Sequence, residues 1–201
     1  MQATLFEETP HNILPFDGEV FFYPAFFSTE ESDRLLQQLK NEIDWKQEPI
    51  KMFGKMVMQP RLTAWYGDSD KAYQYSGITM TPHAWTDSLQ TIKQKIETVS
   101  PVQYSSVLLN LYRDGKDSMG WHRDNEPELG INPVIASVSF GGARTFKLRN
   151  YADKSIIKSM ELTHGSLLIM QGATQHFWEH QIPKTALPVK ERVNLTFRVI
   201  F

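Results

Sequence analysis

The stretch Arg192-Val193-Asn194-Leu195-Thr196-Phe197-Arg198, near the end of the chain, alternates polar and apolar side chains at every step. Successive side chains of a β-strand point to opposite faces, so one face of this segment is apolar and the other carries two arginines, an asparagine and a threonine. We therefore expect a strand over 191–201. Its polar face is either solvent-exposed, as on an edge strand, or lines a cavity where two guanidinium groups grip a small dicarboxylate. The histidine-rich segment just before this strand favours the cavity.

The same period of two begins near residue 104, in segments mostly bounded by Gly, Pro, Asn or Asp. Two helices are expected earlier. Ser28-Thr29-Glu30-Glu31 has the form of a capping box before an apolar stripe, and a second helix is expected to begin at Thr81-Pro82. Helices followed by many short strands indicate an α+β protein with a C-terminal sandwich or jelly roll. The expected strands cover 105–113, 134–141, 144–149, 155–162, 166–171, 175–182 and 191–201.

The composition limits both the fold and the chemistry. With 201 residues, of which 41% are hydrophobic, the chain can bury a substantial core, and we expect a single domain over 1–201. A net charge of −2 excludes a uniformly basic nucleic-acid-binding surface but leaves room for a local basic groove. The absence of cysteine excludes disulfides, Cys zinc sites, iron–sulfur ligation and a Cys nucleophile. Any transition metal must therefore be held by His and carboxylate.

Neither a membrane span nor an export signal is apparent. No stretch approaches the roughly 20 apolar residues that cross a bilayer. The first residues, MQATLFEETPHNIL, lack a basic region followed by an apolar one. We expect a soluble, intracellular monomer, cytoplasmic in a bacterium and nuclear in a eukaryote.

Candidate metal ligands lie in the second half of the chain. His122 and Asp124 form a His-x-Asp pair whose side chains point the same way in an extended segment, although such a pair taken alone is more often a surface hydrogen bond. Two histidines and one carboxylate on one face of a metal leave three positions open, as in non-haem Fe(II) oxygenases. The third ligand is open between His176 and His180, which are four apart on one expected strand. Asn110 and Tyr112 share one face of the strand 105–113 and either line the same cavity or are ordinary strand residues.

Taken together, these segments resemble the AlkB family of Fe(II)- and 2-oxoglutarate-dependent dioxygenases, which repair alkylated nucleic-acid bases. The resemblance covers about Phe53 to Phe201. Its most specific part is the Arg-x-Asn-x-Thr-x-Arg string after a distal His. The motifs that carry it are Asn110-Leu111-Tyr112, His122-Arg123-Asp124, Trp178-Glu179-His180-Gln181-Ile182-Pro183 and Arg192-Val193-Asn194-Leu195-Thr196-Phe197-Arg198.

The resemblance implies a site and a fold. It implies His180 as the third ligand to Fe(II), beside His122 and Asp124, and leaves His176 as a structural neighbour. It also implies a jelly-roll core of eight strands over about 104–201, preceded by helices and a nucleotide-recognition region over about 1–103. Iron so held would keep two positions for 2-oxoglutarate and one for O2. The residues implied to hold 2-oxoglutarate are Asn110, Tyr112, Arg192, Asn194, Thr196 and Arg198.

The implied substrate is a methylated base, of the 1-methyladenine or 3-methylcytosine type, in DNA and perhaps RNA. Hydroxylation of the N-methyl group would release formaldehyde and restore the base, and the nucleotide must be flipped out or single-stranded. Tyr75 matches the family's stacking position, Glu126 the acidic residue that reads the exocyclic amine, and Arg61 the recognition region. Phe53, beside the turn residue Gly54 of an expected hairpin, matches a finger that fills the gap left by a flipped base.

Two features depart from the family pattern. Asn125 stands where close animal relatives carry Asp, and the loop 150–154 is shorter than the basic insertion of the duplex-specific relative. Nearby cationic residues could still contact phosphates, or they form a solvated face. They are Arg144, Lys147, Arg149, Lys154 and Lys158. The main alternative function is a 2-oxoglutarate-dependent hydroxylase of a protein or a small molecule; a non-enzymatic metal-binding interaction module fits the complete cosubstrate set least well.

Overall fold

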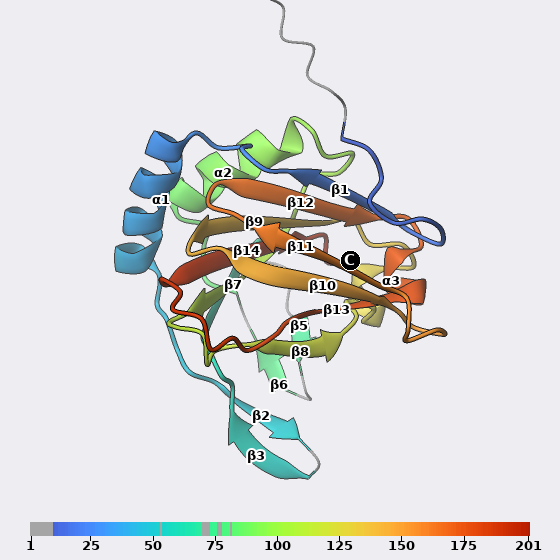
Figure 1. The fold of residues 1–201 in the computed structure, drawn as a ribbon. Coiled ribbons are helices and arrows are strands. Elements are labelled where there is room, and N and C mark those ends of the chain that lie inside the picture. The colour runs from blue at the N-terminus through green and yellow to red at the C-terminus, as the bar shows by residue number, and fades with distance from the viewer. Residues whose placement is uncertain (1–9, 53, 70–72, 76–77, 81) are drawn as a thin grey trace, which may run out of the picture.

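The computed structural model describes residues 10–201 except 53, 70–72, 76–77 and 81. Two antiparallel sheets pack face to face as a jelly roll (Figure 1), as expected. The larger sheet contains β1 (Glu19–Tyr23), β12 (Ser166–Gln171), β9 (Ile135–Gly141), β14 (Arg192–Arg198), β7 (Ser106–Tyr112) and β4 (Leu62–Gly67), in that order. The smaller contains β11 (Ile157–Leu162), β10 (Arg144–Asn150), β13 (Trp178–Ile182) and β8 (Met119–His122).

Two helices cover the outer face of the large sheet (Figure 1). In α1 (Thr29–Glu42) the capping box is confirmed: the Glu31 backbone N–H donates to Ser28 Oγ, and the Glu31 carboxylate accepts from the Ser28 N–H. Such a cap contributes about 1 kcal/mol to helix stability. The apolar stripe of α1 and that of α2 (Asp87–Glu97) are buried against the sheet, so the helices exclude water from one of its faces.

The strand expected from the alternating segment near the end of the chain is β14. It lies inside the large sheet, because it pairs with both β7 and β9. The side chains of Val193, Leu195 and Phe197 are fully buried in the core beneath the helices. The alternate residues of β14 face the space between the sheets, where they line a cavity. The alternation predicted from the sequence is therefore confirmed, and the polar face is the wall of a cavity rather than a solvent-exposed edge.

The second helix begins later than expected. Its N-cap is Thr86, whose side chain accepts from the Leu89 N–H, and not Thr81-Pro82. His83 instead forms an isolated bridge with Tyr66 of β4, and its N–H donates to the Trp65 carbonyl. This pairing with the sheet edge holds the chain extended before the helix can begin; Thr81 itself lies outside the described residues.

The expected strand 175–182 is in fact two elements. Residues Thr174–Phe177 form the short helix α3, and only Trp178–Ile182 form a strand. His176 and His180 therefore do not share a strand face. The short strands β1, β4 and β8 were not predicted, because none shows a long enough run of the two-residue period.

Two hairpins stand apart from the main sheets: β2 (Pro49–Met52) with β3 (Lys55–Met58), and β5 (Tyr73–Tyr75) with β6 (Ile78–Met80). The first projects from the body as an arm (Figure 1). Its expected turn at Gly54 is confirmed by a φ of +78°, which Gly adopts without strain. The remaining helical turn, η1 (Pro127–Leu129), follows β8.

Candidate active site

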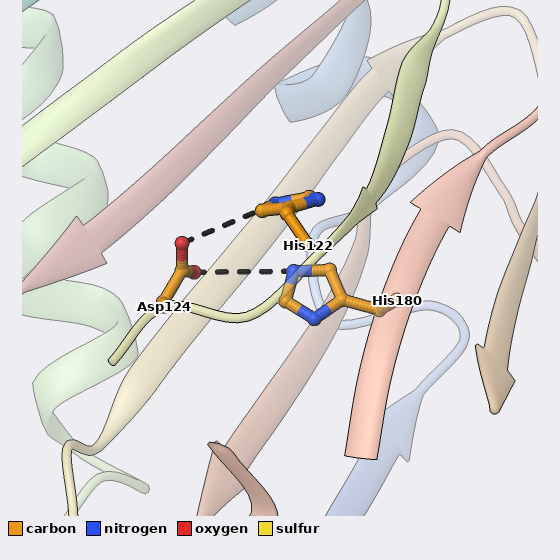
Figure 2. A group of neighbouring side chains, drawn as sticks. All are labelled: His122, Asp124 and His180. Carbon is orange, nitrogen blue, oxygen red and sulfur yellow. Dashed lines mark ion pairs between the residues drawn. The ribbon is translucent and has the colours of Figure 1, made fainter. Parts of the chain in front are cut away.

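The three expected metal ligands converge between the sheets (Figure 2). Antiparallel pairing of β13 with β8 places His180 directly opposite His122, and their ring centroids are 4.2 Å apart. Asp124 follows β8 by two residues and turns its carboxylate toward both rings. Its Oδ1 lies 3.9 Å from His122 Nε2, and its Oδ2 lies 3.9 Å from His180 Nε2.

These distances suit a shared metal ion better than direct hydrogen bonds. A separation of 3.9 Å is too long for a hydrogen bond, whereas atoms that bind one ion at about 2.0–2.2 Å lie about 3–4 Å from each other. Asp124 and His180 are 3% and 6% exposed. Within the described residues, Asp124 Oδ2 and His180 Nδ1 have no hydrogen-bond partner. A buried carboxylate oxygen in that state is costly, and a bound cation would stabilise it.

The electrostatic environment keeps both groups ready to bind a cation. Burial would raise the pKa of Asp124, but its polar neighbours, above all the positive charge of Arg198, outweigh burial and hold that pKa well below its usual value. Burial, together with the neighbouring His122, lowers the pKa of His180 to about 3. At neutral pH the carboxylate is therefore ionised and the His180 imidazole is neutral, and these are the forms that ligate metals.

Neighbouring groups orient the ligands. The Gly120 carbonyl lies 2.8 Å from His122 Nδ1, and because a carbonyl can only accept, Nδ1 carries the proton and Nε2 keeps its lone pair for a metal. The Asp124 backbone N–H donates to Gln175 Oε1 over 2.9 Å. Gln175 is fully buried, and no sequence motif singles it out. It lies in α3, and its role becomes apparent only because the fold places this helix beside the segment that carries Asp124.

The arginine at the start of β14 supplies an anion-binding group within the same cavity. Arg192 is 1% exposed and donates from Nη2 to Ser139 Oγ over 2.9 Å. Its Nε and Nη1 have no hydrogen-bond partner within the described residues. Burial lowers the pKa of Arg192 to about 10, so it stays charged at neutral pH. A buried cation with two donors to spare fits a carboxylate ligand.

The arginine at the end of β14 lies beside the metal ligands. Arg198 Nη2 donates to Asp124 Oδ1 over 2.8 Å. Between the two arginines, Thr196 Oγ1 donates to Asn194 Oδ1 over 3.3 Å, and the Asn194 amide donates to Ser137 Oγ over 2.8 Å. The polar side of β14 is thus a row of four cavity-lining side chains, of which Arg198 lies beside the metal ligand Asp124.

The cavity brings together the metal ligands and the whole expected cosubstrate set. Sequence analysis singled out nine of its lining residues, while Ser137 and the apolar wall were not predicted. Its lining includes Leu108, Asn110, Tyr112, Met119, His122, Asp124, Ser137, Phe146, Leu162, Met170, His180, Gln181, Ile182, Arg192, Asn194, Thr196 and Arg198.

The four residues expected to bind the substrate do not all lie in the cavity. Arg61 is 4% exposed, and its Nε donates to Asn110 Oδ1 over 2.7 Å, so in the structure it supports a cavity residue rather than an open surface. Glu126 lies just after the ligand segment, and its Oε2 is buried without a hydrogen-bond partner in the described part of the chain. The backbone of Tyr75 ends β5, whereas Phe53 lies outside the described residues.

The structure changes the expectation for Arg144 and agrees with the structural role expected for His176. Arg144 does not face phosphates: it is buried and donates to the backbone carbonyls of Asp114, Asp117 and Pro183. His176 Nε2 contacts the Ile131 carbonyl and Asn132 Oδ1, which is a structural role in a loop contact. Since α3 ends before β13 begins, the ring of His176 is not part of the ligand group.

Comparisons with known proteins agree with this geometry. A model of the 2OG-Fe(II) oxygenase superfamily matches residues 19–198. The human "Alpha-ketoglutarate-dependent dioxygenase alkB homolog 3" is 44% identical over 193 residues, covering 92% of this chain and 67% of the relative. Human "DNA oxidative demethylase ALKBH2" is 36% identical over 188 residues, covering 89% and 72%.

The fold has a solved counterpart as well. A structure of OsALKBH1 superposes with a TM-score of 0.60 at 16% identity, covering 89% of this chain and 97% of that one. No helix in the described ranges is long and apolar enough to cross a membrane. The chain therefore belongs to the 2OG-Fe(II) oxygenase superfamily, among its AlkB homologues, and is an Fe(II)- and 2-oxoglutarate-dependent dioxygenase.

Proposed function

We propose that this dioxygenase removes methyl groups from 1-methyladenine- and 3-methylcytosine-type lesions in DNA, with RNA as a further substrate. The observation that carries the proposal is the single cavity in which a His–Asp–His ligand group meets the buried donors of Arg192. The relatives add the substrate class, because one of them is named a DNA oxidative demethylase.

Each side chain has a separate task in this proposal. His122, Asp124 and His180 would hold iron(II), which with 2-oxoglutarate and O2 supplies the oxidation that converts a methyl C–H bond to C–OH and leaves succinate and CO2. Arg192 binds the distal carboxylate of 2-oxoglutarate with its two available donors. Arg198 keeps Asp124 ionised and oriented.

The remaining cavity residues shape the cosubstrate site. Asn110, Tyr112, Asn194 and Thr196 present polar groups along the path between the two arginines. Arg61 orients the Asn110 amide through its 2.7 Å hydrogen bond, and in this way acts on the cosubstrate indirectly.

The substrate side follows from base chemistry. An N-hydroxymethyl base breaks its C–N bond without further help, and it releases formaldehyde as the proton moves from oxygen to the ring nitrogen. We assign Glu126, whose Oε2 is buried and lacks a hydrogen-bond partner within the described residues, to accept a hydrogen bond from the exocyclic amine of the flipped base. Tyr75 is assigned to stack on that base, and Phe53 to fill the gap that it leaves in a duplex.

A turnover assay with a panel of substrates tests the proposal. Oligonucleotides with one 1-methyladenine or 3-methylcytosine, single-stranded and duplex, should stimulate succinate formation, and unmodified oligonucleotides should not. Stimulation by a protein extract or small molecules, with none by any methylated oligonucleotide, would instead support the hydroxylase alternative.

A further inference from the structure

The carboxylate ligand lies beyond the part of the site that the sheets hold. His122 and His180 are paired directly across the antiparallel strands β8 and β13. Strand β8 ends at His122, and Asp124 lies on the coil that follows it (Figure 2). The backbone N–H of Asp124 therefore has no partner in a strand ladder, and a buried N–H without a partner is costly. A group outside the sheets must hold this residue in register with the two histidines.

Gln175 supplies that group. Its Oε1 accepts a hydrogen bond from the Asp124 N–H over 2.9 Å, and both residues are buried. Its Nε2 donates to Met170 Sδ over 3.7 Å, and Met170 lines the cavity. A buried amide is costly unless its polar atoms find partners, so an apolar side chain would fill this space at lower cost if packing were the only purpose. Gln175 therefore ties the segment that carries Asp124 to the wall of the cavity.

The short helix α3 holds Gln175 in place from both sides. Toward β1, Thr174 Oγ1 accepts from the Glu19 N–H over 2.9 Å. On the other side, the His176 carbonyl accepts from Arg123 Nη1 over 3.0 Å. Since Arg123 lies between two of the ligands in the sequence, α3 contacts the ligand-bearing segment at two points, and β13, the strand of the third ligand, begins directly after it. The helix thus fixes one part of the metal site relative to the other.

The side chain of Asp124 has a separate support. Arg198 Nη2 donates to Asp124 Oδ1 over 2.8 Å, so Arg198 acts on the carboxylate, whereas Gln175 acts on the backbone. A metal site requires each ligand atom to lie within about 0.2 Å of its proper distance from the ion. A contact on the carboxylate alone leaves the backbone free to move, and a contact on the backbone alone leaves the carboxylate free to rotate. The two contacts together define where the carboxylate oxygens lie.

We propose that Gln175 is a positioning residue of the iron site, which holds the backbone of Asp124 where its carboxylate can share one metal ion with His122 and His180. The inference rests on the ligand assignment made in the proposed function, and not on the nature of the methylated substrate. Partners that hydrogen-bond to metal ligands typically change metal affinity about 10–100-fold when they are replaced. Loss of the Gln175 acceptor should therefore weaken metal binding, while the binding of 2-oxoglutarate at saturating metal should change little.

Titration of the metal-free full chain with Co(II), followed by the visible absorption of the bound ion, tests this role. Gln175→Met removes both hydrogen bonds at nearly constant side-chain volume and should raise the Kd for Co(II) about 10–100-fold. Gln175→Glu keeps an oxygen acceptor in the same place and should bind Co(II) at least as tightly as wild type. Gln171→Met is the matched control, because it removes only a surface hydrogen bond to Glu19, and should leave the Kd unchanged. The KM of Gln175→Met for 2-oxoglutarate at saturating Fe(II) should equal that of wild type.

The outcomes separate this role from a folding defect and from the ligand assignment. At saturating Co(II), Gln175→Met should reach the wild-type spectrum, which an unfolded protein would not; if it does not fold, Gln175→Asn, whose amide is one CH2 too short to reach, should show the same rise in Kd. Equal affinity of Gln175→Met and wild type, or equal weakening by Gln175→Met and Gln175→Glu, would refute the positioning role. His180→Ala should lose Co(II) altogether; if it does so while Gln175→Met binds like wild type, only this inference fails. If His180→Ala binds Co(II) like wild type, the ligand assignment of the proposed function fails as well.

Discussion

Replacing Arg192 should change the affinity for 2-oxoglutarate without changing the metal ligands. The side chain is 1% exposed, is hydrogen-bonded to Ser139, and has two donors without partners in the described residues. If both donors bind the distal carboxylate of 2-oxoglutarate, each charge-assisted bond contributes about 1.5–3 kcal/mol. Lysine keeps the charge but not the planar fork, so Arg192→Lys should lose about one such bond. The KM for 2-oxoglutarate should therefore rise about tenfold to a hundredfold, with a smaller change in kcat.

A second cosubstrate makes the assignment specific. 2-Oxobutyrate keeps the keto acid but lacks the distal carboxylate, so wild type should strongly prefer 2-oxoglutarate, and Arg192→Met should lose most of that preference. Without cosubstrate, Arg192→Met should unfold at the same or a higher temperature, because it removes a buried charge that is incompletely paired. An unchanged KM in Arg192→Lys, or an equal loss with both keto acids in Arg192→Met, would refute the reasoning.

Three other predictions follow from the same structure, and a fourth, on Phe53, follows from the family resemblance. His180→Ala should abolish iron binding, measured by metal analysis after dialysis, whereas His176→Ala should retain iron; the reverse result would overturn the ligand assignment. Phe53→Ala should slow repair of a lesion in duplex DNA far more than repair of the same lesion in a single strand, and equal losses would indicate a folding defect. Arg144→Met leaves three backbone carbonyls without their donor and should lower the free energy of unfolding by about 3 kcal/mol in urea titrations; a loss below about 1 kcal/mol would show that water replaces the guanidinium. Burial would raise the pKa of Asp117, but its contacts with Arg113 outweigh burial and lower that pKa. The ionised carboxylate therefore stabilises the fold above about pH 4, and this stabilisation is lost as the pH falls through the folded pKa. Asp117→Asn should make the free energy of unfolding less dependent on pH in this acid range, and an unchanged pH dependence would exclude Asp117 as its cause.

The sequence predicted the elements whose patterns are long. Seven residues of strict alternation were enough to predict a strand over 191–201, within which β14 covers Arg192–Arg198, and the capping box at Ser28 located the start of α1. The start of α2 was missed because the Thr81-Pro82 signal is local. The bridge from His83 to Tyr66, which keeps this segment extended, is a contact between distant residues and leaves no local pattern.

The same limit applies to the site. His122 and Asp124 could be proposed from their spacing, but the choice of His180 over His176 depended on family resemblance, because a four-residue spacing fits one strand face. The structure separates them by ending α3 at Phe177. The contact of Gln175 with Asp124 depends on how distant segments pack together, and so does the burial of Arg61 and Arg144. The periodicity of one segment does not predict such contacts.

The central claim is that oxidation of 2-oxoglutarate in this cavity is coupled to the loss of a methyl group from a base. The most direct measurement follows succinate, formaldehyde and the mass of a single-stranded oligonucleotide with one 3-methylcytosine in the same reaction. The account predicts that the oligonucleotide loses one CH2 unit, with one formaldehyde and one succinate formed for each base restored. Succinate formed at the same rate with and without the methylated oligonucleotide, and an oligonucleotide of unchanged mass, would contradict it.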